Sequence, residues 1–344
     1  MAEAGQKLSF NQEEGNIRHT DFSGAAPRKR MTEGVSAVTV TWNSEREIKA
    51  CLDSLSAEAG IHEIIVVDNA STDGTRETVR AFPNVVLIEN PANAGFAAAA
   101  NQGIRASSGE FILLINPDIS FGPGFLAPLA AAMEADPESG AAAPLLMRPD
   151  GETVDSAGLV MKKSRKAFDI GRDEKGAGRF GAPCRVFGAS GAAALYRRRM
   201  LEDAALDGEY FDEAFFAYKE DVDLAWRANL LGWKTLFVPS AVALHARGWK
   251  ASGRACISRG IRRISHRNRY LSIIKNDDPA NLLLHLPQVL FYEAKLFLYS
   301  VLREPFLFLA FIDLARHLPG ALRKRSKLMR RRKVGPAGMR GLYA

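Results

Sequence analysis

The sequence predicts an α/β fold, a doubly wound and mostly parallel sheet followed by a helical C-terminal appendage. Uninterrupted apolar runs alternate with helix-length segments between residues 35 and 135. Such runs are typical of strands buried on both faces, as in parallel sheets that helices cover on each side. Polar side chains follow several of these runs, and doubly wound sheets bind ligands at the carboxyl ends of their strands. After about residue 256 the character changes to helix.

The first part of the chain predicts four strand-helix units. The apolar runs predict strands at 35–42, 61–67, 85–88 and 111–115. The segments between and after them predict helices at 45–58, 75–81, 94–106 and 125–135. Ser44 can cap the first of these helices.

The middle of the chain is less regular. We expect short strands within 153–161, a small-residue strand at 187–198 and a strand at 234–238. A helix is predicted at 220–231, ended by Gly232. The charged stretch 162–179 is expected to be a mobile surface loop.

The 344 residues can bury one large α/β core with an appendage. Three cysteines lie far apart, which argues against a disulfide scaffold or a zinc cluster and suits a reducing cytoplasm: Cys51, Cys184 and Cys256. Residues 1–33 are polar and charged with no apolar core, so we expect a disordered leader and no signal peptide.

The C-terminal region, 256–344, is predicted to be helical and membrane-associating, with a basic tail. Its apolar segments at 281–302 and 305–318 are interrupted by charges, and lysine and arginine cluster at 323–327 and 330–333. This pattern favours amphipathic helices on an anionic bilayer surface over a spanning helix. A helical dimer interface with a solvated basic tail is the alternative. Nucleic-acid binding is not expected, because the tail lacks interleaved aromatic residues.

Two segments at predicted strand ends carry ligand chemistry. Asp68 follows a buried strand and could accept a hydrogen bond from the ring N–H of a pyrimidine, or could simply shape its turn. Asn116-Pro117-Asp118 follows the next buried strand but one, and its oxygens could bind a hard cation, Mg²⁺ or Mn²⁺. An ordinary Asn-Pro-Asp turn is the alternative.

Three carboxylates open the helix predicted at 220–231. Glu220 and Asp223 fit the helix dipole, and Asp223 can pair with Arg227 at i, i+4. Asp221 follows the apolar wall 215–218 and could be tuned as a general base. His245, in an apolar context, could bind the same metal or be structural.

The segment Asn93–Asn101 opens a predicted helix at the carboxyl end of a strand, but it lacks the GxGxxG spacing of a dinucleotide site. No GxxxxGK[ST] motif occurs in the sequence. Both observations count against a dinucleotide-dependent dehydrogenase and a P-loop kinase.

Taken in order, these segments resemble the GT-A-type family 2 glycosyltransferases, in particular the rhamnosyltransferase and galactofuranosyltransferase branch. The resemblance covers 35–249 and continues more loosely to 277. The segments that carry it are Thr41-Trp42-Asn43, the run 67–74, Asn93–Asn101, Asn116-Pro117-Asp118, Gly188–Arg198, Glu220–Asp223, His245 and, more loosely, Arg267-Asn268-Arg269-Tyr270.

The resemblance implies a GT-A catalytic domain at 34–255, with a nucleotide-binding half at 34–120 and an acceptor half at 140–255. It implies inverting transfer from a nucleoside-diphosphate sugar with Mg²⁺ or Mn²⁺. The residue roles that it implies are nucleotide binding by Thr41, Asn43, Asp68, Asn93 and Asn116, metal binding by Asp118 and His245, proton abstraction by Asp221, and acceptor-pocket support by Glu220 and Asp223.

The resemblance also implies substrates. The donor is expected to be dTDP-L-rhamnose, with a UDP-sugar as the second choice, and the acceptor a glycan or lipid-linked glycan at the cytoplasmic face of the membrane. No Gln-x-x-Arg-Trp segment occurs, which favours single addition over polymerisation. A non-catalytic nucleotide-sugar-binding or scaffold protein of the same fold is the alternative. A nucleotidyltransferase is disfavoured because no Gly-rich loop follows the first strand.

Overall fold

The computed structural model describes residues 32–247 and 257–344. The expected leader therefore lies outside the described residues, except that Thr32 and Glu33 begin the first strand. Trp249 and Cys256 also lie outside them. The first strands and helices are β1 (Thr32–Thr41), α1 (Ile48–Ala57), β2 (Ile61–Asp68), α2 (Thr75–Arg80), β3 (Val85–Glu89), α3 (Phe96–Ala106), β4 (Gly109–Ile115), β5 (Ile119–Ser120) and α4 (Leu126–Ala135).

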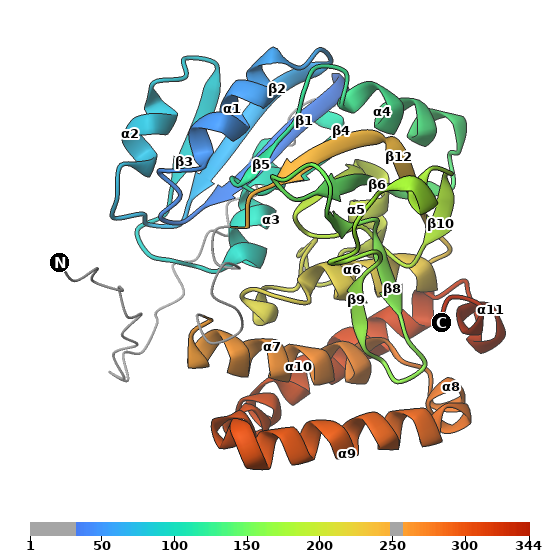
Figure 1. Cartoon of the computed structure of the whole chain (residues 1–344). Helices are drawn as coiled ribbons and strands as arrows, with labels where there is room; N and C mark the ends of the chain where they lie inside the picture. The colour runs from blue at the N-terminus through green and yellow to red at the C-terminus, as the bar shows by residue number, and fades with distance from the viewer. Residues whose placement is uncertain (1–31, 248–256) are drawn as a thin grey trace.

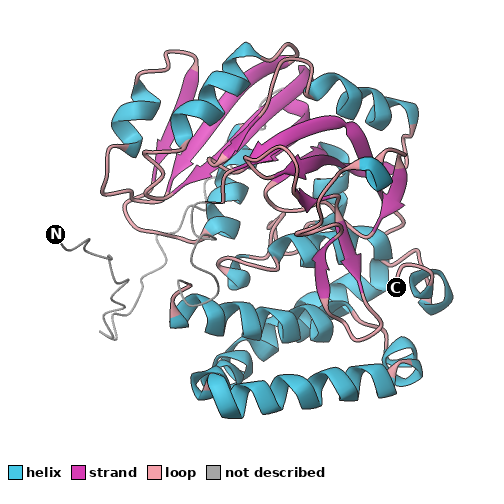
Figure 2. Ribbon diagram, viewed as in Figure 1, coloured by secondary structure: helices cyan, strands magenta, loops and turns pink. Residues whose placement is uncertain are grey.

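One large mixed sheet forms the centre of the molecule (Figures 1 and 2). Its strand order is β10-β12-β6-β11-β4-β1-β2-β3, with β5 beside β12 and β7 beside β6. The pairs β1–β2, β1–β4, β2–β3 and β6–β12 are parallel, whereas β11 is antiparallel to both β4 and β6. The remaining strands are β6 (Ser139–Met147), β7 (Val154–Ser156), β8 (Leu159–Met161), β9 (Ala167–Asp169), β10 (Cys184–Val186), β11 (Ala193–Arg197) and β12 (Lys234–His245).

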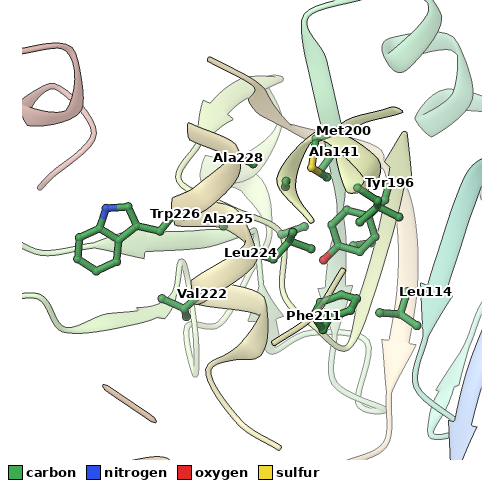
Figure 3. Packing of buried hydrophobic residues seen from close by; sticks show 14 of the residues in the cluster. Leu114, Ala141, Tyr196, Met200, Phe211, Val222, Leu224, Ala225, Trp226 and Ala228 are labelled. Atoms are coloured by element: carbon green, nitrogen blue, oxygen red, sulfur yellow. The ribbon is translucent and has the colours of Figure 1, made fainter. Parts of the chain in front are cut away.

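Helices cover both faces of the sheet, as the continuous apolar runs predicted. On β1, Val38 and Val40 face one hydrophobic cluster, and Val35 and Ala37 face the other. The first cluster contains α3, α5 (Arg198–Ala204) and α6 (Glu220–Leu230), and the second contains α1 and α4. Figure 3 shows the first cluster, where Leu224 of α6 lies towards Tyr196 and Phe211.

The described C-terminal residues form a helical layer beneath the sheet (Figure 2). The two predicted apolar helices correspond to α8, α9 and the start of α10, and α10 continues through the basic clusters. The helical elements outside the sheet layers are η1 (Gly178–Phe180), η2 (Glu213–Phe215), α7 (Arg259–Asn276), α8 (Pro279–Leu284), α9 (Leu286–Arg303), η5 (Pro305–Phe308), α10 (Leu309–Arg331) and α11 (Pro336–Arg340).

This layer is packed into the main core. Leu328, Met339 and Tyr343 belong to the same buried cluster as Trp226 of α6. Lys324 of α10 makes ion pairs with Asp212 and Glu209, both at 2.7 Å. The basic residues of α10 are therefore held against carboxylates of the same chain, which differs from the solvated or lipid-bound tail that we expected. Further contacts of this kind join Arg323 and Lys327 to Asp207, Arg331 and Lys333 to Asp203, and Arg332 to Asp278.

Two other predictions are wrong in detail. The stretch 162–179, expected to be a mobile loop, contains β9, which pairs with β8, and a buried Arg165 that is ion-paired to Asp277 at 2.7 Å. The strand predicted at 234–238 continues to His245 after a register shift between Val238 and Val242. This extension brings His245 into register with Ile119 of β5.

A buried ion network joins α7 to the loop before α6. Lys275 Nζ lies 2.8 Å from Asp223 Oδ2 and also contacts Asp212, which is bound from the other side by Lys324. Burial by itself would raise the pKa of Asp212, but the ion pairs with Lys275 and Lys324 lower it below its ordinary value.

We predict that Lys275→Met lowers the free energy of unfolding by about 3–5 kcal/mol, because it removes one partner of a buried ion network and leaves carboxylates uncompensated. Urea denaturation at pH 7 measures the change. Lys49→Met is the control, because Lys49 makes an exposed i, i+4 pair with Asp53 and should cost less than about 0.5 kcal/mol. Equal losses in the two variants would contradict a stabilising role for the network.

Candidate active site

The backbone that precedes α6 is left-handed at three residues. Phe216, Tyr218 and Lys219 have φ angles of 62°, 69° and 73°. Each such conformation costs about 1–3 kcal/mol for a residue other than glycine and is maintained only where the surroundings determine it. The strained segment leads directly to Glu220 and Asp221 at the start of α6.

Asn268 of α7 holds this segment in place. Its side-chain amide lies 2.8, 3.0 and 2.7 Å from the carbonyl oxygens of Phe215, Ala217 and Tyr218. From the opposite side, Gly95 lies so close that a Cβ there would meet the Phe216 carbonyl oxygen at 2.7 Å. The backbone N–H of Ala97 donates to the same oxygen at 3.1 Å. The start of α3 and the middle of α7 therefore fix the entry to α6.

Asp221 is anchored to the loop that precedes β11. Its Oδ2 accepts a hydrogen bond from Gly191 N–H at 3.0 Å, and its Oδ1 accepts one from Val222 N–H at 2.7 Å. The next residue, Ala192, accepts from Asn116 N–H at 2.8 Å. Asp221 and the Asn116–Asp118 segment therefore flank the same two-residue stretch. Burial raises the pKa of Asp221, and nearby Lys219 opposes this only in part.

The neighbouring Glu220 is perturbed as well. It is buried, and its Oε2 has no hydrogen-bond partner among the described residues. Burial, together with the adjacent Asp221, raises the pKa of Glu220 to about 8, against the weaker opposing effect of Lys219. Burial therefore raises the pKa of both neighbouring carboxyl groups, and the two titrate as a pair.

Asp223 lies elsewhere than expected. Its side chain is fully buried and contacts Arg227 at 2.9 Å, Lys275 at 2.8 Å and Asn276 at 2.7 Å. These contacts satisfy both carboxylate oxygens inside the protein. The geometry gives Asp223 a structural role, so the acceptor-pocket role that we expected is not supported.

Asp118 and His245 come together as the sequence suggested. His245 Nε2 lies 3.3 Å from Asp118 Oδ2, and Nδ1 lies 2.7 Å from Asp155 Oδ2. Burial lowers the pKa of His245, but the hydrogen bonds to Asp118 and Asp155 outweigh it and raise the pKa above the ordinary value. A carboxylate on Nδ1 orients an imidazole so that Nε2 can bind a metal.

The pair fits a divalent cation that also binds a ligand. One carboxylate and one imidazole converge, and no group of three or more His, Cys, Asp or Glu residues that could hold a metal occurs within 32–247 and 257–344. An ion at this place would take its remaining oxygen ligands from substrate phosphates and water, as Mg²⁺ usually does. The Asn116 backbone is held by Ala192, as above, and accepts a long contact from Cys51 Sγ at 3.6 Å.

Arg247 and Asp169 connect the surroundings of His245 to those of Asp221, and sequence reasoning predicted neither residue. Arg247 Nη2 lies 2.6 Å from Asp155 Oδ2 and 3.7 Å from Asp169 Oδ2. Asp169, at the end of β9, also contributes to the raised pKa of Asp221. No motif indicated Asp155, Asp169 or Arg247, because they meet only when β7, β9 and the end of β12 are assembled.

The predicted nucleotide-binding residues cluster at the carboxyl ends of β1 and β2. Thr41 and Asp68 are register partners, and Thr41 Oγ1 donates to Asp68 Oδ1 at 3.1 Å. Ser71 donates to Asp68 through its hydroxyl at 2.5 Å and its N–H at 2.9 Å. Asn43, left-handed at φ 51°, accepts from Thr72 N–H at 2.8 Å. Asp68 therefore shapes its own turn, which was the alternative to a contact with a pyrimidine base.

Asn93 lies in the exposed loop after β3, where its side chain accepts from Gly95 N–H at 2.9 Å. Sequence reasoning placed Asn69 at this edge but gave it no role of its own, and in the structure it joins this loop to β2. Its Nδ2 donates to Gly95 O at 3.1 Å, and its Oδ1 accepts from Asn90 at 2.9 Å. The structure therefore places Thr41, Asn43, Asp68 and Asn93 on one contiguous edge.

Comparison with solved structures defines the class of this fold as GT-A glycosyltransferase. A structure of TarS from S. aureus (residues 1–349) superposes with a TM-score of 0.54 at 19% identity, covering 82% of this chain and 78% of that one. The mannosyltransferase PcManGT from Pyrobaculum calidifontis, in complex with GDP-Man and Mn²⁺, gives 0.51 at 21% identity, covering 86% and 79%. GalNAc-T7 with UDP, GalNAc and Mn²⁺ gives 0.55 at 17% identity, covering 70% and 48%.

Sequence comparison identifies the family. The Glycosyl transferase family 2 model matches residues 36–204. The N-acetylglucosaminyl-diphospho-decaprenol L-rhamnosyltransferase of Mycobacterium tuberculosis is 32% identical over 243 residues, which cover 62% of this chain and 76% of that protein. The hexosyltransferase Agl10 of Haloferax volcanii is 24% identical over 216 residues, covering 59% and 64%. The chain belongs to glycosyltransferase family 2 and is a glycosyltransferase, as the resemblance indicated.

We predict that Glu220→Gln removes a pH dependence of stability. A raised carboxyl pKa means that the folded state holds the proton more tightly than the unfolded state does. The stabilisation that this proton gives to the folded state is complete near pH 4 and is lost as pH rises to about 8. The variant should match wild type at pH 5 and exceed it by about 1 kcal/mol or more at pH 8.5. Urea denaturation at several pH values measures the difference.

Glu77→Gln is the matched control, because Glu77 lies exposed on α2. Its difference from wild type should stay constant across the same pH range. A constant difference for Glu220→Gln as well would show that Glu220 is ionised in the folded protein at ordinary pH.

Proposed function

We propose that this protein is an inverting glycosyltransferase that moves L-rhamnose from dTDP-L-rhamnose to a hydroxyl of a glycan or lipid-linked acceptor, in a metal-assisted single displacement. The observation that carries the proposal is the arrangement around Gly191 and Ala192. Asp221 is held on one side of these residues, and the Asn116–Asp118 segment, with His245, on the other. A base and a diphosphate site then face one reacting centre.

In the proposed reaction Asp221 accepts the proton of the acceptor hydroxyl. The hydroxyl oxygen forms a bond to the anomeric carbon from the face opposite the nucleotide, while the bond from that carbon to the phosphate oxygen breaks. The nucleoside diphosphate leaves with the electron pair, and the configuration at carbon is inverted. The hydrogen bonds that Asp221 accepts from Gly191 N–H and Val222 N–H favour the charged form that acts as the base.

Asp118 and His245 would hold Mg²⁺ or Mn²⁺ on the diphosphate. The ion would neutralise the charge that develops on the leaving group. Asp155 orients His245 for this role, and Arg247 binds Asp155 and lies beside Asp169. Thr41, Asn43, Asp68 and Asn93 would bind the nucleotide along the edge that they share, together with Asn116, which directly follows β4.

The rhamnose donor is supported by the mycobacterial relative, whose name states L-rhamnosyl transfer. A UDP-sugar is the second choice, because TarS has been solved with UDP and with UDP-GlcNAc. The lipid-linked acceptor rests on the same mycobacterial name, which specifies an N-acetylglucosaminyl-diphospho-decaprenol.

We propose peripheral binding at the cytoplasmic face of the membrane through the helical layer. Large apolar side chains are exposed along α8, α9 and the start of α10, among them Leu283, Leu290, Phe291, Leu298, Leu302 and Ile312. Pro305–Arg331 is long and apolar enough by composition to cross a membrane, but Leu328 within it is buried in the main core. An exposed Cys184 suits a reducing compartment.

We predict that Asp221→Asn lowers turnover by a factor of roughly 10²–10⁴, because it removes the general base. Release of dTDP from dTDP-L-rhamnose, with a synthetic N-acetylglucosaminyl-diphospho-lipid as acceptor, measures this. The assay is run with Mn²⁺ and with EDTA, which should abolish the wild-type reaction. Stabilisation of the variant by dTDP with Mn²⁺ should match wild type, since the nucleotide edge is unchanged.

Asp53→Asn, in the exposed pair on α1, is the control and should keep full activity. Turnover by Asp221→Asn above a tenth of wild type would remove the base assignment. A wild type that is stabilised by nucleotide sugars but forms no product from any donor would instead be a non-catalytic binding protein.

We predict that replacing four exposed leucines, Leu283, Leu290, Leu298 and Leu302, by serine weakens binding to anionic phospholipid vesicles at least tenfold. Each of these side chains is 57–69% exposed, so the change removes apolar surface with little effect on the core. Vesicle co-sedimentation measures the binding. Val86→Ser, on the remote strand β3, should leave it unchanged, and unaltered binding by the fourfold variant would exclude this face as the anchor.

A further inference from the structure

A cationic cavity lies between the start of α6 and the helical layer. Its volume is about 240 Å³, and its wall includes residues from the β8–β9 hairpin, α6, α7 and α9. Five of the lining residues are cationic and none is a carboxylate: Arg165, Lys166, Lys219, Arg262 and Arg269. A cavity of this composition favours a polyanion.

Three of these cationic side chains form ion pairs with carboxylates that do not line the cavity. Arg165 pairs with Asp277 at 2.7 Å, Arg269 pairs with Glu293 at 2.6 Å, and Arg262 pairs with Glu304. These ion pairs orient the guanidinium groups and neutralise part of their charge. The Nε atoms of Arg262 and Arg269 are buried and have no hydrogen-bond partner among the described residues. Both arginine side chains line the cavity, so their charge contributes to the potential inside it.

The two lysines supply charge that no carboxylate neutralises by direct contact. Within the described residues, neither Lys166 nor Lys219 has an acidic side chain at ion-pair distance. Lys166 lies 6.0 Å from the ring of Tyr292, and Lys219 acts at longer range on Glu220 and Asp221. Arginines held in place by ion pairs, together with two uncompensated lysines, match the several oxygens and double charge of a diphosphate.

The cavity lies beside the catalytic carboxylate. Tyr218, Lys219 and Val222 line it, whereas Asp221, two residues after Lys219, contacts Gly191 and is not part of its wall. Consecutive Cα atoms are about 3.8 Å apart, so the Cα atoms of Lys219 and Asp221 are within about 8 Å. Val222 and Trp226 extend to the side of α6 away from Leu224 (Figure 3). An anion in the cavity would thus hold an attached sugar near Asp221.

The other end of the cavity meets apolar surface. Tyr292 and Leu296 of α9 line it, and Leu290, Phe291, Phe297 and Leu298 of the same helix are exposed. One helix therefore forms both a wall of the anion cavity and part of the apolar face proposed to contact the bilayer. Asp221, the cationic cavity and the apolar face of α9 therefore follow one another along the molecule.

We infer that this cavity binds the diphosphate of a polyisoprenyl-diphosphate-linked acceptor, with its glycan at Asp221 and its lipid chain along α9. The inference rests on the proposed function and adds the place and residues of acceptor recognition. It separates the acceptor's diphosphate from that of the donor, which belongs to the strand ends at Asp118 and His245.

Binding of farnesyl diphosphate, a soluble isoprenyl diphosphate, tests the inference without turnover. Calorimetry should show at least tenfold weaker binding to Lys166→Gln/Lys219→Gln than to wild type. Lys162→Gln/Lys295→Gln removes two lysines that do not line the cavity and should bind as wild type does. The double arginine variant, Lys166→Arg/Lys219→Arg, should restore affinity, which a merely unfolded glutamine variant could not explain.

Three further ligands separate the sources of binding. Inorganic pyrophosphate should bind more weakly than farnesyl diphosphate, farnesol should bind weakly and equally to all variants, and dTDP with Mn²⁺ should not displace the probe. Equal affinity of both glutamine variants, displacement by dTDP, or no gain from the isoprenyl chain would each overturn the inference. Absence of rhamnose transfer together with lysine-dependent probe binding would sink the proposed donor reaction but leave this site in place.

Discussion

The hydrogen bonds from Asn268 to the carbonyl oxygens of Phe215, Ala217 and Tyr218 tie the catalytic edge to the C-terminal helices. Without a partner of this kind, Phe216, Tyr218 and Lys219 would have to keep their left-handed backbone by themselves. The conformation matters because it directs Glu220 and Asp221 towards the loop at Gly191. A helix of the C-terminal layer thus determines where Asp221 lies.

The same helix carries the buried charge that fixes α6. Lys275 and Asn276 bind Asp223, and Lys275 shares Asp212 with Lys324 of α10. Buried charges remain stable only when they are paired and hydrogen-bonded. The carboxylates at the start of α6 therefore divide into two kinds. Asp223 is saturated by partners inside the protein, whereas Asp221 and Glu220 keep capacity for a ligand or a proton.

The helical layer contains both basic and apolar residues, and composition alone cannot tell which of them have partners inside the protein. The net charge of its basic residues suggested an anionic surface as partner. In the structure these residues are largely bound to Asp203, Asp207, Asp212 and Asp278. Its apolar residues divide between Leu328 in the core and the exposed side chains of α9. Contact with a bilayer would therefore depend on apolar surface more than on the basic clusters.

The sequence by itself determined the alternation of strands and helices, the carboxyl-end position of Asp68, Asn116 and Asp118, and the family. These features are local, because apolar periodicity and turn residues act within a few positions of the chain. The partners of each charge were decided only by the tertiary structure. Asp223 and Asp221 are two residues apart, yet one is buried against α7 and the other meets Gly191. Asp155 reaches His245, and Arg165 reaches Asp277, across 90 and 112 positions of the chain. Side chains so far apart in sequence meet only through packing, which spacing does not encode.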